Sequence, residues 1–184
     1  MDYVIMQGMS IFRILGIPSD GPGKSSPETE TVRKITRALD QLEPARAKFI
    51  AAFAYLLSRA ARADLNISPA ETRTIERIVM EHGHLPEEQA VIVVQMAKTQ
   101  TVLFGGTENY LVSREFNAAA THDEKMALLD CLFAVAASED AISTIEDNEI
   151  SQIADELRIE HRDFISVRSR YRDHLAVLKK NPLP

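Results

Sequence analysis

Residues 49–79, FIAAFAYLLSRAARADLNISPAETRTIERIV, decide the fold, because a related stretch returns as residues 124–154, EKMALLDCLFAVAASEDAISTIEDNEISQIA. At a constant offset of 75 residues, as from Ile67 to Ile142, apolar positions recur on both sides of a short polar stretch. The matched apolar pairs are Phe53 with Leu128, Leu57 with Leu132, Ile67 with Ile142, Ile75 with Ile150 and Ile78 with Ile153, and the matched polar pairs are Ser68 with Ser143, Glu71 with Glu146 and Asp64 with Glu139. The sequence therefore predicts two pseudo-symmetric helix-loop-helix repeats.

Helical periodicity extends over most of the remaining chain, in which strong helix formers are plentiful. The most central helix is expected over 44–63, where apolar side chains from Phe49 to Ala60 form a stripe wide enough for the middle of a bundle. Further helices are expected over 30–42, 69–81, 86–103, 108–119, 122–137, 145–157 and 161–178. The predicted fold class is all-α, in a single domain of about seven to eight helices.

The beginning of the chain differs in composition from the rest. Residues 1–15 are rich in apolar side chains and predict an N-terminal apolar helix that is too short to span a bilayer. Such a helix packs on the body of the protein or makes, at most, a peripheral membrane contact. Residues 16–28 combine glycine, proline and serine, which predicts a flexible linker, and residues 29–184 form the predicted helical domain. Met9 is an alternative start of the chain.

The composition limits the classes of partner. A formal net charge of -6 argues against a nucleic-acid partner, because such binding needs a basic surface. The single cysteine, Cys131, excludes an intrachain disulfide and favours a cytoplasmic location. Charge is uneven, with seven basic and two acidic residues from Arg33 to Arg62, and eight acidic and one basic from Glu139 to Glu160. These segments favour complementary faces within the fold or between subunits, and so a protein partner or self-association, and the alternative is a mixed solvated surface.

Two segments carry a resemblance to a known family. Residues 61–71, ARADLNISPAE, and residues 135–146, VAASEDAISTIE, each join an alanine-rich helix end to an acidic loop and a following glutamate. In this they resemble the TerB tellurite-resistance family, over about residues 30–178. Leu65 and Asp140 stand where the family has a loop glycine. The resemblance implies a non-enzymatic all-α domain of seven or so helices, a divalent-cation site lined by loop acids, and a role in resistance to tellurite and other stresses.

The acidic loops contain the candidate metal ligands. Carboxylate, amide and loop carbonyl oxygens suit a hard cation such as calcium or magnesium. The candidates are Asp64, Asn66, Glu71, Glu139, Asp140 and Glu146. The alternative for Glu71 and Glu146 is structural, because Ser68 and Ser143 precede them by three residues in the pattern of a capping box. For Asp64, Glu139 and Asp140 the alternative is a solvated acid at a helix end, which costs little. Neither loop has the glycine and terminal glutamate of an EF-hand.

Two other classes of function remain open beside a cation-binding module. A purely structural adaptor would use the loops as capping devices and dock a protein partner. A hydrolase using the clustered acids is the weaker alternative, because the sequence contains no nucleophile with a base at suitable spacing. His82 and His84 flank Gly83 and read as a solvated turn rather than a zinc or copper site, and Cys131 reads as a core residue.

Overall fold

The computed structural model describes residues 27–61, 68–103, 109–138 and 141–179, and within these ranges the chain is almost entirely helical. Nine α-helices and one 3-10 helix are present there: α2 (Pro27–Asp40), α3 (Pro44–Ala61), α4 (Pro69–Glu81), α5 (Glu87–Leu103), α6 (Asn109–Ala119), α7 (His122–Ala137), α8 (Thr144–Glu156), α9 (His161–Arg170), η1 (Arg172–His174) and α10 (Ala176–Lys179). The all-α prediction is confirmed. None of the described helices is long and apolar enough to cross a membrane.

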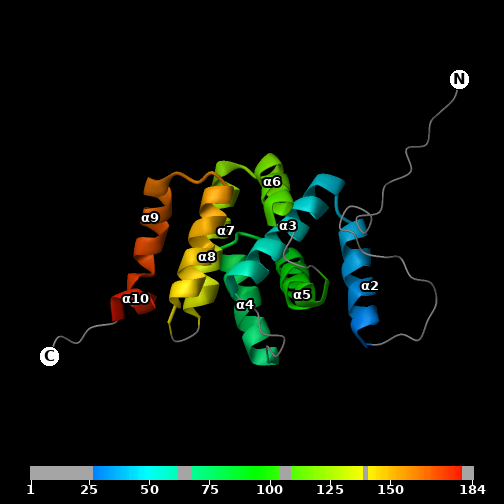
Figure 1. Cartoon of the computed structure of the whole chain (residues 1–184). Coiled ribbons are helices and arrows are strands. Elements are labelled where there is room, and N and C mark those ends of the chain that lie inside the picture. Colours follow the sequence, from blue (N-terminus) through cyan, green and yellow to red (C-terminus); the bar gives the residue numbers. More distant parts are fainter. Residues whose placement is uncertain (1–26, 62–67, 104–108, 139–140, 180–184) are drawn as a thin grey trace, which may run out of the picture.

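Helix α3 lies at the centre of the fold. It crosses the middle of the molecule in Figure 1, with α2 and α5 on one side and α8 and α9 on the other. It contacts α2, α5, α6, α7 and α8. Its side chains from Phe49 to Leu57 are all buried, which explains why the sequence there is apolar on every face rather than along one stripe. The prediction of a central helix over this segment is confirmed.

Helix α7 is the second core helix. Every residue from Ala127 to Ala136 is buried except Asp130, and the largest of these side chains is that of Phe133. Phe133 packs against Phe164 of α9, with ring centroids 5.9 Å apart. On the other side of the core, an aromatic ring of α6 stacks on one of α3, where the centroids of Phe116 and Phe49 are 5.0 Å apart. The outer helices are thus fixed to α3 and α7 by large apolar side chains.

The two halves of the chain share several landmarks. Helices α4 and α8 both begin with a capping box, at Ser68 and Ser143. After each of them a residue with positive φ precedes the next helix, at His84 (φ 53°) and Arg158 (φ 55°). Contacts between the halves are reciprocal, because α3 packs on α8 while α4 packs on α7. The superposition of residues 49–79 on 124–154 stays a prediction.

Burial differs between the halves at two matched positions. Ile150 and Ile153 of α8 are fully buried, whereas Ile75 and Ile78 of α4 are only partly buried against the same core. Helix α8 is therefore the more deeply inserted of the two.

The last predicted helix is the main difference from expectation. Residues 161–178 were expected to form one helix, but α9 ends at Arg170, and a 3-10 turn leads to the extended Leu175. The reason is a tertiary contact. The Ile142 N–H donates to the His174 carbonyl at 2.8 Å, and the Ala176 N–H donates to the Ile142 carbonyl at 2.9 Å. This single β-bridge outweighs the local helical pattern.

The N-terminal predictions are largely outside the described residues. The predicted apolar helix over 1–15 lies outside them, as do residues 16–26 of the predicted linker. Helix α2 begins at Pro27, inside the last two residues of that linker. Proline at the start of a helix is favourable, because its missing N–H would have no helical partner there.

Candidate functional site

The two helices that follow the acidic loops start with the same hydrogen-bonded arrangement. The Ser68 N–H donates to Oε2 of Glu71 at 2.7 Å, and the Glu71 N–H donates to the Ser68 hydroxyl oxygen at 3.2 Å. At Ser143 and Glu146 the corresponding distances are 2.8 and 3.2 Å. These pairs satisfy N–H groups that have no partner within the helix. The capping-box interpretation of both glutamates is therefore confirmed.

The contacts of Glu71 also affect the ionisation of its carboxyl group. Hydrogen bonds from the Ser68 side chain and backbone lower the pKa of Glu71 below its ordinary value, because they favour the charged form. This carboxylate is therefore ionised at neutral pH.

The other four candidate ligands cannot be placed beside these glutamates. Asp64, Asn66, Glu139 and Asp140 lie outside the described residues. Among the residues that are described, no group of three or more histidine, cysteine, aspartate or glutamate side chains is arranged to hold a metal ion. Each loop thus contributes one described carboxylate, and the cation site stays a prediction.

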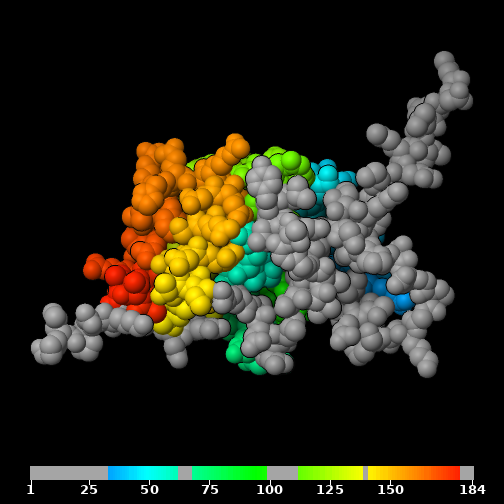
Figure 2. Space-filling view, in the orientation of Figure 1, coloured from blue at the N-terminus to red at the C-terminus, as the bar shows by residue number. Residues whose placement is uncertain are grey.

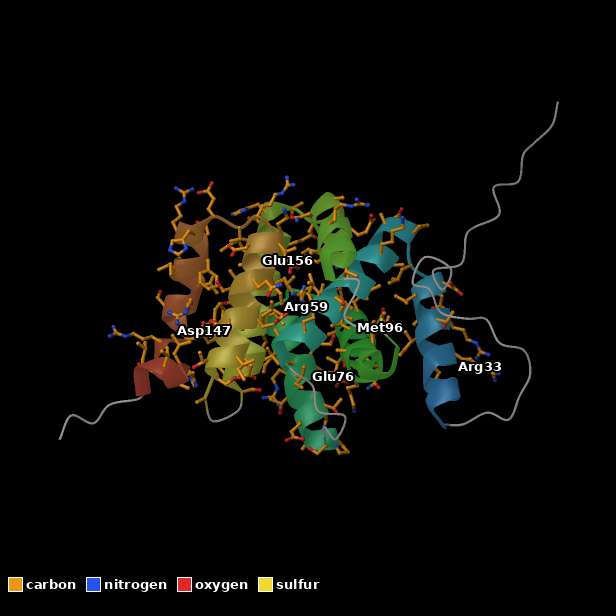
Figure 3. All side chains as sticks on the ribbon, viewed as in Figure 1. Arg33, Arg59, Glu76, Met96, Asp147 and Glu156 are labelled. Atoms are coloured by element: carbon orange, nitrogen blue, oxygen red, sulfur yellow. The ribbon has the colours of Figure 1, made fainter. Side chains whose placement is uncertain are left out.

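The main buried charge cluster joins α3, α6 and α8 (Figure 3). Arg59 lies in the last turn of α3, and its side chain is 8% exposed. Its Nε donates to Glu149 at 2.8 Å, and its two terminal nitrogens donate to Glu156 at 2.7 and 3.1 Å. The Ser113 hydroxyl of α6 also donates to Glu156. This geometry is bidentate at Glu156, which makes it stronger than a single charged hydrogen bond.

The ionisation of this cluster follows from its contacts. Burial alone raises the pKa of Glu156, but hydrogen bonds from Arg59 and Ser113 outweigh it, so that the pKa falls below its ordinary value. Burial alone lowers the pKa of Arg59, and the contacts with Glu156 and Glu149 reverse that effect and raise it. Both groups are therefore charged at neutral pH, and the cluster is a true ion pair.

A second polar cluster centres on Asp130 of α7. Nδ1 of His82, at the end of α4, lies 2.7 Å from Oδ2 of Asp130. The Tyr171 hydroxyl donates to Oδ1 at 3.0 Å, and Arg170 donates to the same oxygen at 3.3 Å. Burial and the neighbouring Asp130 charge raise the pKa of Tyr171, so the phenol stays protonated and remains a donor. The cluster ties α4, α7 and the end of α9 together.

His82 and His84 lie in different surroundings. His82 is held by Asp130 through one ring nitrogen, whereas His84 is exposed on the turn that leads to α5. The interpretation of this segment as a turn is thus supported by its geometry. Cys131 is fully buried, and burial raises the pKa of its thiol, as expected of a core residue.

Sequence reasoning missed both polar clusters. One signal was present, since the basic segment 33–62 and the acidic segment 139–160 had been expected to face each other within the fold or between subunits. Arg59 with Glu149 and Glu156 is such a contact within the fold. A further signal was Arg59 itself, a charged residue inside a run of buried side chains, where an arginine needs an acidic partner.

Comparison with known proteins identifies the family. The family model described as Tellurite resistance protein TerB matches residues 49–169, which is more than half of the chain. No curated protein and no solved structure matches the chain. The family match spans both predicted repeats and ends in α9. The chain therefore belongs to the TerB family.

Proposed function

We propose that this TerB-family protein is a non-enzymatic cytoplasmic module that binds a divalent cation at its two acidic loops and acts in resistance to tellurite and other stresses. The observation that carries the proposal is the pair of fixed carboxylates at the loop ends. Glu71 and Glu146 are each held in place by a serine at the start of a helix that directly follows an acidic loop.

The donor set at each loop fits a hard cation. Asp64 and Asn66 precede Glu71, and Glu139 and Asp140 precede Glu146, so each loop offers oxygen atoms from several side chains. Calcium and magnesium both prefer such oxygen ligands. Glu71 is ionised, because its hydrogen bonds with Ser68 lower its pKa. It would contribute one charged oxygen without losing its capping role.

Thermal unfolding during titration with calcium or magnesium chloride tests this proposal. A cation that binds the native state raises the melting temperature in proportion to the logarithm of its concentration. Asp64→Asn together with Glu139→Gln should remove that rise. Asp155→Asn is the matched control, because Asp155 is an exposed acid at the far end of α8. An unchanged melting temperature of the wild-type protein at millimolar cation would rule out the cation-binding function.

A second candidate function is a protein adaptor, and three exposed apolar side chains on α8 and α10 favour it. Ile145, Val177 and Leu178 are 51%, 48% and 53% exposed. The β-bridge between Ile142 and Leu175 brings the start of α8 and α10 to the same end of the molecule, where Figure 2 shows them side by side in yellow and red. Large apolar side chains that are exposed on neighbouring elements are typical of protein-binding surfaces.

Sedimentation equilibrium separates the two candidates. An adaptor that self-associates through these side chains should show a concentration-dependent mass, and Ile145→Ser with Leu178→Ser should return it to the mass of one chain. Calcium or magnesium should not change the result. Ile165→Ser on α9, another exposed isoleucine, is the control.

A further inference from the structure

We propose that Arg59, together with Glu149 and Glu156, fixes the register in which α8 packs on α3. This role is separate from cation binding and from partner docking. It concerns which position α8 takes when it packs on α3. The argument rests on the spacing of the two glutamates, on the apolar nature of the surrounding contact, and on a third helix that closes the cluster.

The apolar contact between these helices does not by itself select one position. Ile150 and Ile153 of α8 and Leu56 and Ala60 of α3 are buried in one continuous core. Burial of apolar surface is favourable but non-directional, because it depends on the area removed from water rather than on the orientation of particular atoms. Apolar burial alone therefore does not distinguish the observed position from one displaced by a turn, about 5.4 Å away.

The ionic contact is sensitive to such a shift. Glu149 and Glu156 are seven residues apart, so they lie on one face of α8, two turns from each other. Displacing α8 by four residues in one direction would bring Ile145 and Gln152 to their places. In the other direction it would bring Ile153 and Glu160, and Glu160 lies beyond the end of the helix. Either shift leaves the buried guanidinium of Arg59 without most of its partners.

Contacts with α6 also favour the observed position of α8. The Ser113 hydroxyl donates to the Glu156 carboxylate, and Nδ2 of Asn117 donates to the Glu156 backbone carbonyl at 2.7 Å. Ser113 is itself buried. These contacts fix both the side chain and the backbone at the end of α8. A shift in one direction would replace the charged acceptor of buried Ser113 by the neutral Gln152, and a shift in the other would place no helical residue there.

A buried ion pair can specify one arrangement without adding net stability. Removing one partner is strongly unfavourable, because it leaves an uncompensated charge, whereas replacing the whole cluster by neutral groups is often tolerated. The register role can thus be separated from a contribution to stability. The variant that separates them carries Arg59→Met, Glu149→Gln and Glu156→Gln.

The experiment compares this triple variant with the wild-type full chain. Its melting temperature should stay close to that of the wild type. Its ¹H–¹⁵N spectrum should show broadened or doubled resonances for α6 and α8, and the amides of α8 should exchange at least about tenfold faster. The control carries Arg168→Met and Asp147→Asn, which removes a bidentate pair between α9 and α8 and leaves Arg59 intact. Its spectrum should keep a single set of resonances for α8, and α8 should keep its contact with α3.

Each other outcome overturns the proposal. One sharp set of α8 resonances with wild-type exchange in the triple variant would mean that apolar packing alone sets the register. A triple variant that fails to fold would mean that the cluster supplies net stability instead. The single Arg59→Met variant gives a second check, because two uncompensated carboxylates should lower its melting temperature clearly below that of the triple variant. Equal melting temperatures of the two variants would also contradict the proposed role.

Discussion

The Tyr171 hydroxyl donates a hydrogen bond to the Asp130 carboxylate at 3.0 Å, and so joins the end of α9 to the middle of α7. The Tyr171 ring also stacks on Phe133, with centroids 5.7 Å apart and an interplanar angle of 15°. One side chain at a helix end thus makes both an apolar and a polar contact with the core helix. A variant that lacks only the hydroxyl group measures the polar contact separately from the apolar one.

Tyr171→Phe should therefore lower the free energy of unfolding by about 1–2 kcal/mol, because the stacking is kept while a donor to a charged acceptor is lost. Urea unfolding followed by circular dichroism measures it. Tyr171→Leu loses the stacking as well and should cost more. Wild-type stability in Tyr171→Phe would show that the hydroxyl contributes nothing.

Gly83→Ala should destabilise the protein by roughly 1–3 kcal/mol. A Cβ atom there would lie 2.6 Å from the Val79 carbonyl oxygen and 3.0 Å from Cζ of Phe53. The carbonyl belongs to the backbone of α4 and cannot rotate away, so the end of the helix would have to move. The midpoint of thermal unfolding is the readout. Ser169→Ala, on the exposed face of α9, serves as the control and should leave it unchanged.

His84→Gly and Arg158→Gly should each leave stability unchanged or raise it, by up to about 1 kcal/mol. Both residues have a left-handed backbone, with φ of 53° and 55°, in which glycine is not strained. Both are exposed, so that the loss of the side chain removes little packing. Chemical unfolding of each variant gives the result. A clear loss of stability in both would mean that these side chains make contacts that outweigh the strain.

Stability should fall on acidification through the titration of Glu156. Its pKa in the folded protein lies below the ordinary value, so its contribution is present above that value and is lost as the pH falls toward the folded pKa. Unfolding midpoints in urea between about pH 7 and pH 3 measure the loss, which should be smaller in Glu156→Gln than in the wild type. The control is Ser169→Ala, a change on the exposed face of α9 that alters no titratable group, and its pH profile should follow the wild type.

The sequence predicted the elements that depend on local patterns. The capping boxes at Ser68 and Ser143 and the buried helix around Phe53 follow from residue spacing alone, and the structure contains them where they were expected. Local information failed at the end of α9, where the pattern continued but the Ile142 bridge required extended backbone at Leu175. The spacing of apolar residues along a helix carries no information about a contact with a residue so distant in the sequence.

The polar clusters could not be predicted, because they depend on which helix faces which. Arg59 meets Glu149 and Glu156 only after α8 has packed on α3, and Asp130 meets His82 only after α4 has packed on α7. Spacing along the chain shows which residues share one face of a helix, but it does not show which other helix that face packs against. The candidate metal ligands were a different case, since only Glu71 and Glu146 of the six are among the described residues.

The burial of Cys131 has a chemical consequence under oxidising stress. Only the thiolate form of cysteine reacts readily with oxidants, and burial both shields this sulfur and raises the pKa of its thiol. Because it is the chain's single cysteine, the folded protein presents no reactive sulfhydryl group. We expect an agent that consumes cellular thiols to leave this molecule unmodified, and covalent linkage of two copies through sulfur to require unfolding first.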